Sequence, residues 1–173
     1  TLGETNTVVI QGLLASSGLG IILGSIIAGR VSRDYIETAL IPVGAIGIAV
    51  TLFLVQGLHS TWAHGLNFFM LGVMGGFFLV PLNALIQFHA GEQGLGRVLA
   101  ANNFIQNIWM LTFLGITVAA AYVEIGDVTL LLGLALVALI GAIYTLYQLP
   151  QSLVRFLIRH LVATRFRLKV LGL

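Results

Sequence analysis

The chain has 173 residues, of which 58% are hydrophobic and only 8% are charged, and its formal net charge is +2. This composition is far more apolar than that of an average soluble domain. The sequence contains no cysteine, which excludes disulfide bonds and thiolate zinc sites. We therefore expect an integral membrane protein.

Five long apolar segments predict five transmembrane helices. They lie at residues 7–29, 38–57, 63–88, 98–123 and 128–148. Each is close to the ~20 residues that cross a bilayer as a helix, and each apolar run is too long and too continuous for the strands of a membrane barrel. We predict an all-α polytopic membrane protein, with a helical bundle at residues 1–148 and a basic tail at residues 149–173.

Small residues recur every four positions through the first segment. They are Gly12, Ser16, Gly20, Gly24 and Ala28. This spacing places them on one helix face, which another backbone can approach closely enough for van der Waals packing. We expect an inner helix that packs through this face, although glycine is also common in membrane helices in general.

All eight basic residues lie on one side of the predicted topology. Arg30 and Arg33 follow the first segment, Arg97 follows the third, and the other five lie in the tail. The alternate loops contain no lysine or arginine. The positive-inside rule therefore places the amino terminus outside and the carboxyl terminus in the cytoplasm, with Arg30 and Arg33 in a cytoplasmic loop.

The third segment combines small and polar residues with a proline. On a helical projection, two glycines and two carboxamides share one face: Gly72, Gly76, Asn83 and Gln87. Pro81 removes the helical hydrogen bond to the carbonyl of Phe77, which predicts a helix hinge at this position.

Four carboxamides open the fourth segment: Asn102, Asn103, Gln106 and Asn107. Because the third segment runs inward and the fourth outward, we expect these side chains to lie at the depth of Asn83 and Gln87 and to converge with them. Two interpretations stay open. The carboxamides form interhelical hydrogen bonds, worth roughly 0.5 to 2 kcal/mol each, or they line a substrate path together with Gly72 and Gly76.

The tail at residues 149–173 changes character. Apolar residues recur at helical spacing opposite Arg155 and Arg159, which is typical of a helix lying at a membrane surface. From Arg165, basic and apolar residues alternate, which is typical of a strand. We expect an interfacial tail that leads into a truncated cytoplasmic domain, and a solvated basic tail is the alternative.

Several chemistries have no motif in this sequence. There is no nucleotide-binding loop, HExxH or GxSxG, and no acidic or basic residue lies in the middle of a predicted span. We therefore expect no catalytic residue, cofactor or metal site. Because the chain opens on Thr1 and enters an apolar segment at once, we also expect a fragment whose amino-terminal part is missing.

The string GVMGGFFLVPLNALIQ at residues 72–87, followed by AANNFIQN at residues 100–107, resembles the lysophospholipid transporters of the major facilitator superfamily. The resemblance implies the last five helices of a six-helix carboxyl-terminal bundle, without the preceding helix and the amino-terminal bundle. The superfamily's cytoplasmic loop signature falls at residues 29–33 in a degenerate form. The tail is similar to the junction in bacterial fusions of such a transporter to a glycerophospholipid acyltransferase, whose HxxxxD motif does not occur before Leu173.

The function implied by the resemblance is flippase-like import of lysophospholipid. The lipid would move from the outer to the inner leaflet of the bacterial cytoplasmic (inner) membrane, where an acyltransferase restores its missing chain. The implied partners are the lysophospholipid, membrane lipids, the amino-terminal helical bundle and a fused or associated acyltransferase, with no nucleic acid. Two alternatives are a membrane anchor for a phospholipid acyltransferase and a major facilitator transporter of another solute.

Overall fold

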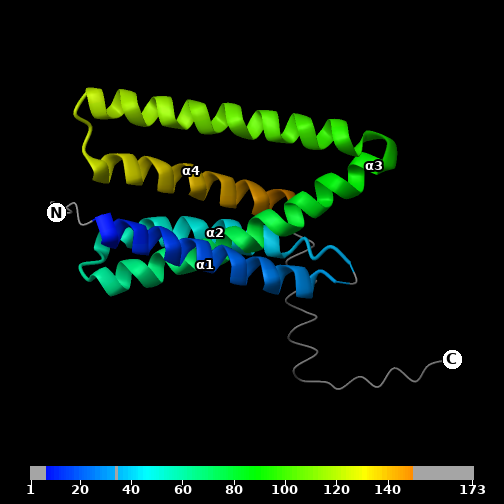
Figure 1. The fold of residues 1–173 in the computed structure, drawn as a ribbon, viewed down its shortest axis with the longest axis horizontal. Helices are drawn as coiled ribbons and strands as arrows, with labels where there is room; N and C mark the ends of the chain where they lie inside the picture. Colours follow the sequence, from blue (N-terminus) through cyan, green and yellow to red (C-terminus); the bar gives the residue numbers. More distant parts are fainter. Residues whose placement is uncertain (1–6, 34, 150–173) are drawn as a thin grey trace, which may run out of the picture.

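The computed structural model describes residues 7–33 and 35–149 (Figure 1). The elements in chain order are α1 (Thr7–Val31), α2 (Leu40–Leu54), the short 3-10 helix η1 (Val55–Gly57), α3 (Thr61–Tyr122) and α4 (Asp127–Gln148). No strand occurs in these ranges, and the all-α prediction is confirmed. The predicted interfacial helix and strand of the tail lie outside the described residues.

Helix α3 consists of two helices of transmembrane length that meet at a break (Figure 1). We call Thr61–Gly91 the first arm and Gly94–Tyr122 the second arm. Within the described residues, the two arms, α1, Leu40–Gly57 and α4 are long and apolar enough to cross a membrane. The prediction of five spans is therefore confirmed, and the chain is a multi-pass membrane protein.

The break in α3 lies at a glycine that the sequence analysis did not single out. Gly91 has φ of 64° and ψ of 168°, a backbone region that is essentially restricted to glycine. Helical structure therefore continues up to Gly91 and resumes soon after it, where the sequence predicted a longer connection between residues 88 and 98. The single positive φ is sufficient to end one helix and begin the next.

The hinge expected at Pro81 is not where α3 leaves helical geometry. Pro81 is almost completely buried, and the only non-helical φ and ψ within α3 are those of Gly91. Proline costs the helix one hydrogen bond, but its fixed φ is compatible with helical backbone. The change in dihedral angles therefore occurs at Gly91, and Pro81 lies in the packed part of the first arm.

The first arm of α3 packs against α1 through glycines on both helices. A Cβ added to Gly24 would lie 2.8 Å from the Cα of Val73, and added Cβ atoms at Gly20, Gly72 and Gly76 would also meet backbone atoms at less than 3.0 Å. Side chains do not tolerate such distances, so the two backbones are in direct contact. We call these four residues, Gly20, Gly24, Gly72 and Gly76, the glycine interface.

The small-residue face of α1 is divided between packed and open positions. Ala28 is completely buried, and the two α1 members of the glycine interface are also buried. Ser16 donates a 2.6 Å hydrogen bond from its hydroxyl to the carbonyl oxygen of Gly65 in the first arm. Gly12 is exposed, and a Cβ there would have no neighbour within 4 Å. Close packing therefore begins about one turn after Gly12.

Helix α2 contacts both the first arm of α3 and α4. The buried Asn67 donates a 3.0 Å hydrogen bond from Nδ2 to the carbonyl oxygen of Thr51, and this bond ties α3 to α2 within the apolar interior. Ala135 and Ala142 form the buried positions of α4. The core is therefore made by α1, α2 and the first arm, with α4 added to it.

The second arm of α3 lies outside this core. In the most apolar stretch of the second arm, only 6% of the residues are buried, whereas 39% are buried in the corresponding stretch of Leu40–Gly57. Large apolar side chains are exposed along it, including Trp109 at 69% and Met110 at 65%. Most of the surface of the second arm is therefore not covered by the other described helices.

Candidate functional site

The six carboxamides of the predicted path lie toward one end of the bundle, on either side of the break at Gly91. Asn83 is half-buried and Gln87 is exposed near the end of the first arm. On the second arm, Asn102 is half-buried and three others are exposed: Asn103, Gln106 and Asn107. This is also the end that carries Arg30, Arg33 and Arg97, and we call it the basic end.

The structure gives no hydrogen bond between the two sets of carboxamides. Among the described residues, the one hydrogen bond formed by any of these six side chains runs from Nδ2 of Asn107 to the carbonyl oxygen of Asn103, at 2.9 Å. This bond lies within a single helix and does not hold two helices together. In the described part of the chain these side chains therefore do not act as interhelical connections, and their polar groups are available to other partners.

The buried carboxamide that does connect two helices is a different one. Asn67 lies near the beginning of the first arm, far along the helix from Asn83, and its hydrogen bond to Thr51 is interhelical. The sequence analysis did not single it out, because an isolated asparagine in an apolar run carries no pattern. A polar side chain within an otherwise apolar helix is the kind of residue that forms interhelical hydrogen bonds, and this is the one signal that could have identified it.

Gly72 and Gly76 lie in the glycine interface, so α1 covers the surface at which a substrate would have to contact them. They were predicted to line the path because they share a helical face with Asn83 and Gln87. In the structure, this helical face has a covered part and a more exposed part. Its first part is closed by α1, whereas its last turns, toward the basic end, are more exposed.

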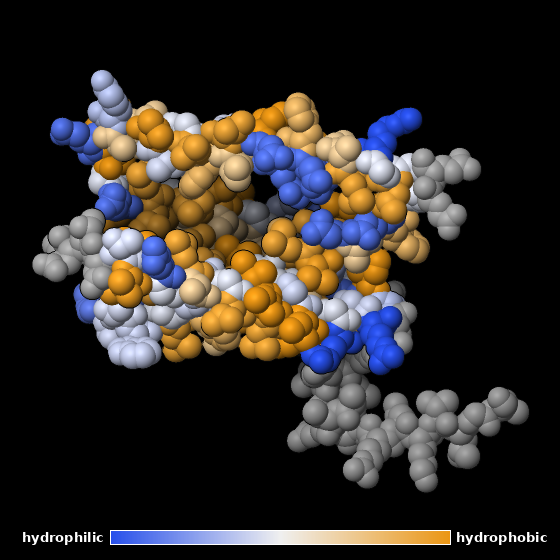
Figure 2. Space-filling view, viewed as in Figure 1, coloured by the Kyte–Doolittle hydropathy of each residue, from blue (hydrophilic) through white to orange (hydrophobic). Residues whose placement is uncertain are grey.

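A largely apolar cavity of about 750 Å³ separates the second arm of α3 from α4. Phe113 and Thr117 both line it, and they lie about three helical turns after Asn102 and Gln106 on the same face of the second arm. The hydroxyl of Thr117 donates to the carbonyl oxygen of Phe113 at 2.9 Å, so its polarity is directed back into its own helix. The cavity walls therefore suit apolar groups. In the space-filling view, the molecule is hollowed between the second arm and the helices below it, and the surrounding residues are largely hydrophobic (Figure 2).

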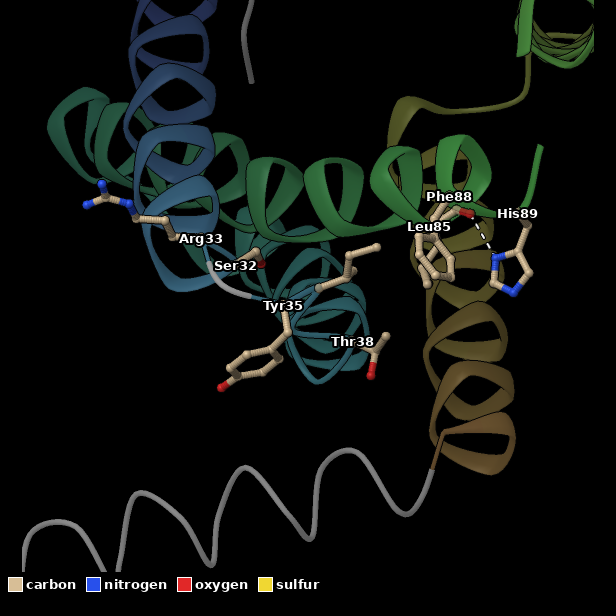
Figure 3. A pocket seen from close by; sticks show the side chains of 8 residues that line it. Ser32, Arg33, Tyr35, Thr38, Leu85, Phe88 and His89 are labelled. Carbon is tan, nitrogen blue, oxygen red and sulfur yellow. Dashed lines mark hydrogen bonds between the residues drawn. The ribbon is translucent and has the colours of Figure 1, made fainter. Parts of the chain in front are cut away.

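The basic end contains a second cavity, of about 600 Å³, between the α1–α2 connection and the end of the first arm (Figure 3). It is lined by Ser32, Arg33, Tyr35, Ile36, Thr38, Leu85, Phe88 and His89. Among the described residues, no group of three or more His, Asp or Glu side chains is arranged to hold a metal ion. The described polar side chains that line this cavity are hydroxyls, a guanidinium and an imidazole.

Comparison with known proteins supplies the functional context for this geometry. The chain is 42% identical to the lysophospholipid transporter LplT of Photorhabdus laumondii over 101 residues, which cover 57% of this chain and 25% of that protein. It is 37% identical to LplT of Klebsiella pneumoniae over 134 residues, which cover 76% of this chain and 33% of that protein. The predicted resemblance to lysophospholipid transporters is confirmed.

A third relative is LplT of Yersinia enterocolitica, which is 36% identical over 117 residues covering 66% of this chain and 28% of that protein. The chain thus corresponds to about a quarter to a third of the length of the transporters it matches. No protein-family model and no solved structure matches it. All three relatives carry the name of a transporter and not of an enzyme, which agrees with the absence of catalytic motifs from the sequence.

Proposed function

We propose that this chain is part of a transporter that moves lysophospholipid from the outer to the inner leaflet of a bacterial cytoplasmic membrane for re-acylation. The observation that carries the proposal is its similarity to three bacterial transporters named for that substrate, together with five helices of transmembrane length. The lack of charged residues in the middle of the spans favours a lipid over a small ion as the cargo.

Two surfaces of the chain fit the two parts of such a substrate. A lysophospholipid has one acyl chain and one polar headgroup. Within the described part of the chain, the carboxamides at the basic end have unused donors and acceptors. We propose that Asn83, Gln87, Asn102 and Gln106 contact the headgroup, with Asn103 and Asn107 beside them. The exposed apolar residues of the second arm, among them Met110 and Phe113, would face the acyl chain.

The open faces of the chain also support a larger assembly. We propose that these are five helices of a six-helix bundle, and that a helix preceding them in the longer protein fills the cavity between the second arm and α4. The amino-terminal bundle would then cover the carboxamide face. The support is the size and apolar lining of the cavity and the low burial of the second arm.

The proposed orientation places the basic end in the cytoplasm. Arg30, Arg33 and Arg97 lie there, whereas the connections at the opposite end contain no lysine or arginine. In the full-length protein, with any cysteines elsewhere removed, a cysteine introduced at His59 or Gly126 should react with an impermeant thiol reagent added outside intact cells. One introduced at Gly94 should react only after permeabilisation, and its labelling in intact cells would reverse the orientation.

The product of transport would need an acyltransferase. We propose that an acyltransferase follows the tail in the same polypeptide or associates with it. The basis is the sequence of residues 149–173, which lies outside the described part of the chain apart from Leu149. Purification of the full-length protein followed by an assay of acyl transfer to lysophospholipid would decide this point.

Transport itself is tested by uptake of a labelled lysophospholipid. Spheroplasts that lack their own lysophospholipid transporter and express the full-length protein should accumulate the lipid in the inner leaflet, whereas spheroplasts with an empty vector should not. A bound acyltransferase without transport would acylate only lipid already present inside. Absence of uptake by a folded, correctly inserted protein would contradict the proposal and favour a membrane anchor.

A further inference from the structure

One buried carboxylate lies in the connection between α1 and α2, at the basic end. Glu37 is only 8% exposed, and no other acidic side chain is buried among the described residues. Its backbone N–H donates to the hydroxyl oxygen of Ser32 at 3.3 Å, and its carbonyl oxygen accepts from the N–H of Leu40 at 3.2 Å. These two bonds hold Glu37 at the beginning of α2.

The carboxylate of Glu37 has no partner within the described part of the chain. No ion pair or side-chain hydrogen bond joins it to Arg30, Arg33 or Arg97, which are the basic residues described. Figure 3 shows the guanidinium of Arg33 directed away from the other side chains drawn there. A buried carboxylate is costly when it is unpaired and is tolerated when a cation satisfies it. A cation from the rest of the protein therefore fits this position.

All other basic residues of the chain follow α4. They are Arg155, Arg159, Arg165, Arg167 and Lys169. Helix α2 runs away from the basic end, α4 runs toward it, and the two helices are in contact, so the end of α4 lies beside the beginning of α2 (Figure 1). The tail therefore starts near Glu37. From Leu149 to Arg155 the chain spans about 9 Å as a helix and about 20 Å when it is fully extended.

We propose that Arg155 forms an ion pair with Glu37 and docks the tail on the connection between α1 and α2. Arg155 is the first cation after α4, so the chain that has to be ordered to form this pair is the shortest. A guanidinium presents parallel N–H donors that match the two oxygens of a carboxylate. The inference requires neither transport nor a particular orientation in the membrane, because Glu37 and Leu149 lie at the same end of the bundle.

The first test is the rate of tryptic cleavage after Arg159 in the full-length protein, measured by mass spectrometry in an uncharged detergent, where no lipid headgroup can hold the tail. Glu37→Gln should speed this cleavage about tenfold, because the loss of a charge-assisted hydrogen bond releases the tail. The matched control is Asp34→Asn, which removes the other carboxylate of the same connection, and the rate should be unchanged. An unchanged rate in Glu37→Gln, or equal acceleration in both variants, would overturn the proposal.

A double-mutant cycle of melting temperatures in the same detergent separates the ion pair from a general loosening of the bundle. Arg155→Gln should lower the melting temperature by several degrees, because it leaves the buried carboxylate without a cation. Adding Glu37→Gln to that variant should restore part of the loss. Arg165→Gln, farther along the tail, is the control and should have no effect. Additive losses in the double variant, or no loss in Arg155→Gln, would contradict the ion pair and leave the transport proposal untouched.

Discussion

The two arms of α3 have similar lengths and apolar composition, yet they pack in opposite ways. The first arm meets α1 with backbone against backbone at the glycine interface, whereas the second arm is separated from α4 by a cavity of about 750 Å³. Glycines of the first arm face glycines of α1, and bulky residues such as Trp109 and Phe113 line the cavity beside the second arm. Both arms are therefore apolar, and they differ in the size of the side chains that face the neighbouring helix.

The difference has a physical reason in a membrane. Lipid tails are as apolar as leucine, so burial of hydrophobic surface does not by itself hold two membrane helices together. Close contact between backbones does, because many weak van der Waals contacts form at once. The second arm lacks such a surface toward α4, and its large side chains remain open to lipid, to substrate or to other helices. The first arm builds the core, and the second arm leaves large apolar side chains exposed.

The largest expected effect comes from a bulky residue in the glycine interface. Gly24→Leu should prevent recovery of folded protein, because the leucine has to displace the backbone of Val73, and overpacking of this kind costs about 1–3 kcal/mol or more. The matched control is Gly115→Leu in the second arm, where an added Cβ has no neighbour within 4 Å. Its melting temperature should match that of the parent protein. Equal stability of the two variants would contradict the distinction between the arms.

The join between the arms should be the next most sensitive position. Gly91→Ala places a side chain on a backbone with φ of 64° and ψ of 168°, which should cost about 1–3 kcal/mol in the free energy of unfolding. Gly94→Ala, at the start of the second arm, should be neutral or slightly stabilising, because alanine favours helix. Reversible unfolding in mixed micelles measures both. If the two changes have the same effect, Gly91 does not hold the break.

A smaller effect should separate packing carboxamides from free ones. Asn67→Leu removes the interhelical bond to Thr51, which should lower stability by roughly 0.6 to 1.7 kcal/mol. Asn103→Leu, at an exposed position of the second arm, should leave stability unchanged. The same unfolding assay applies. A larger loss at Asn103 than at Asn67 would show that the second arm is packed after all.

The sequence was sufficient for the number, order and approximate positions of the helices, because length and continuous apolarity determine what spans a bilayer. It also identified Gly20 and Gly24, since a repeat of small residues is itself the signal for close packing. It did not locate the break at Gly91. Several glycines lie between residues 90 and 97, and nothing local distinguishes the one that adopts a positive φ.

The candidate site was less accessible to sequence reasoning. A helical projection put Gly72 and Asn83 on one face, but it does not reveal that α1 covers the first and leaves the second more open. Convergence of the carboxamides across the break depends on how the second arm is directed after Gly91, which is a property of the tertiary structure. The basic-end cavity arises from residues of the α1–α2 connection and the first arm, which are about 50 positions apart and share no motif.

We propose that the carboxamides near the break contact the lipid headgroup, and uptake by carboxamide variants tests this contact most directly. Asn83→Leu and Gln106→Met should reduce lysophospholipid uptake by the full-length protein more than tenfold per folded molecule, because each removes a hydrogen bond that costs about 1–3 kcal/mol to leave unmade. Asn67→Leu is the control, and it should reduce uptake only in proportion to the loss of folded protein. Normal uptake in both Asn83→Leu and Gln106→Met would contradict the claim.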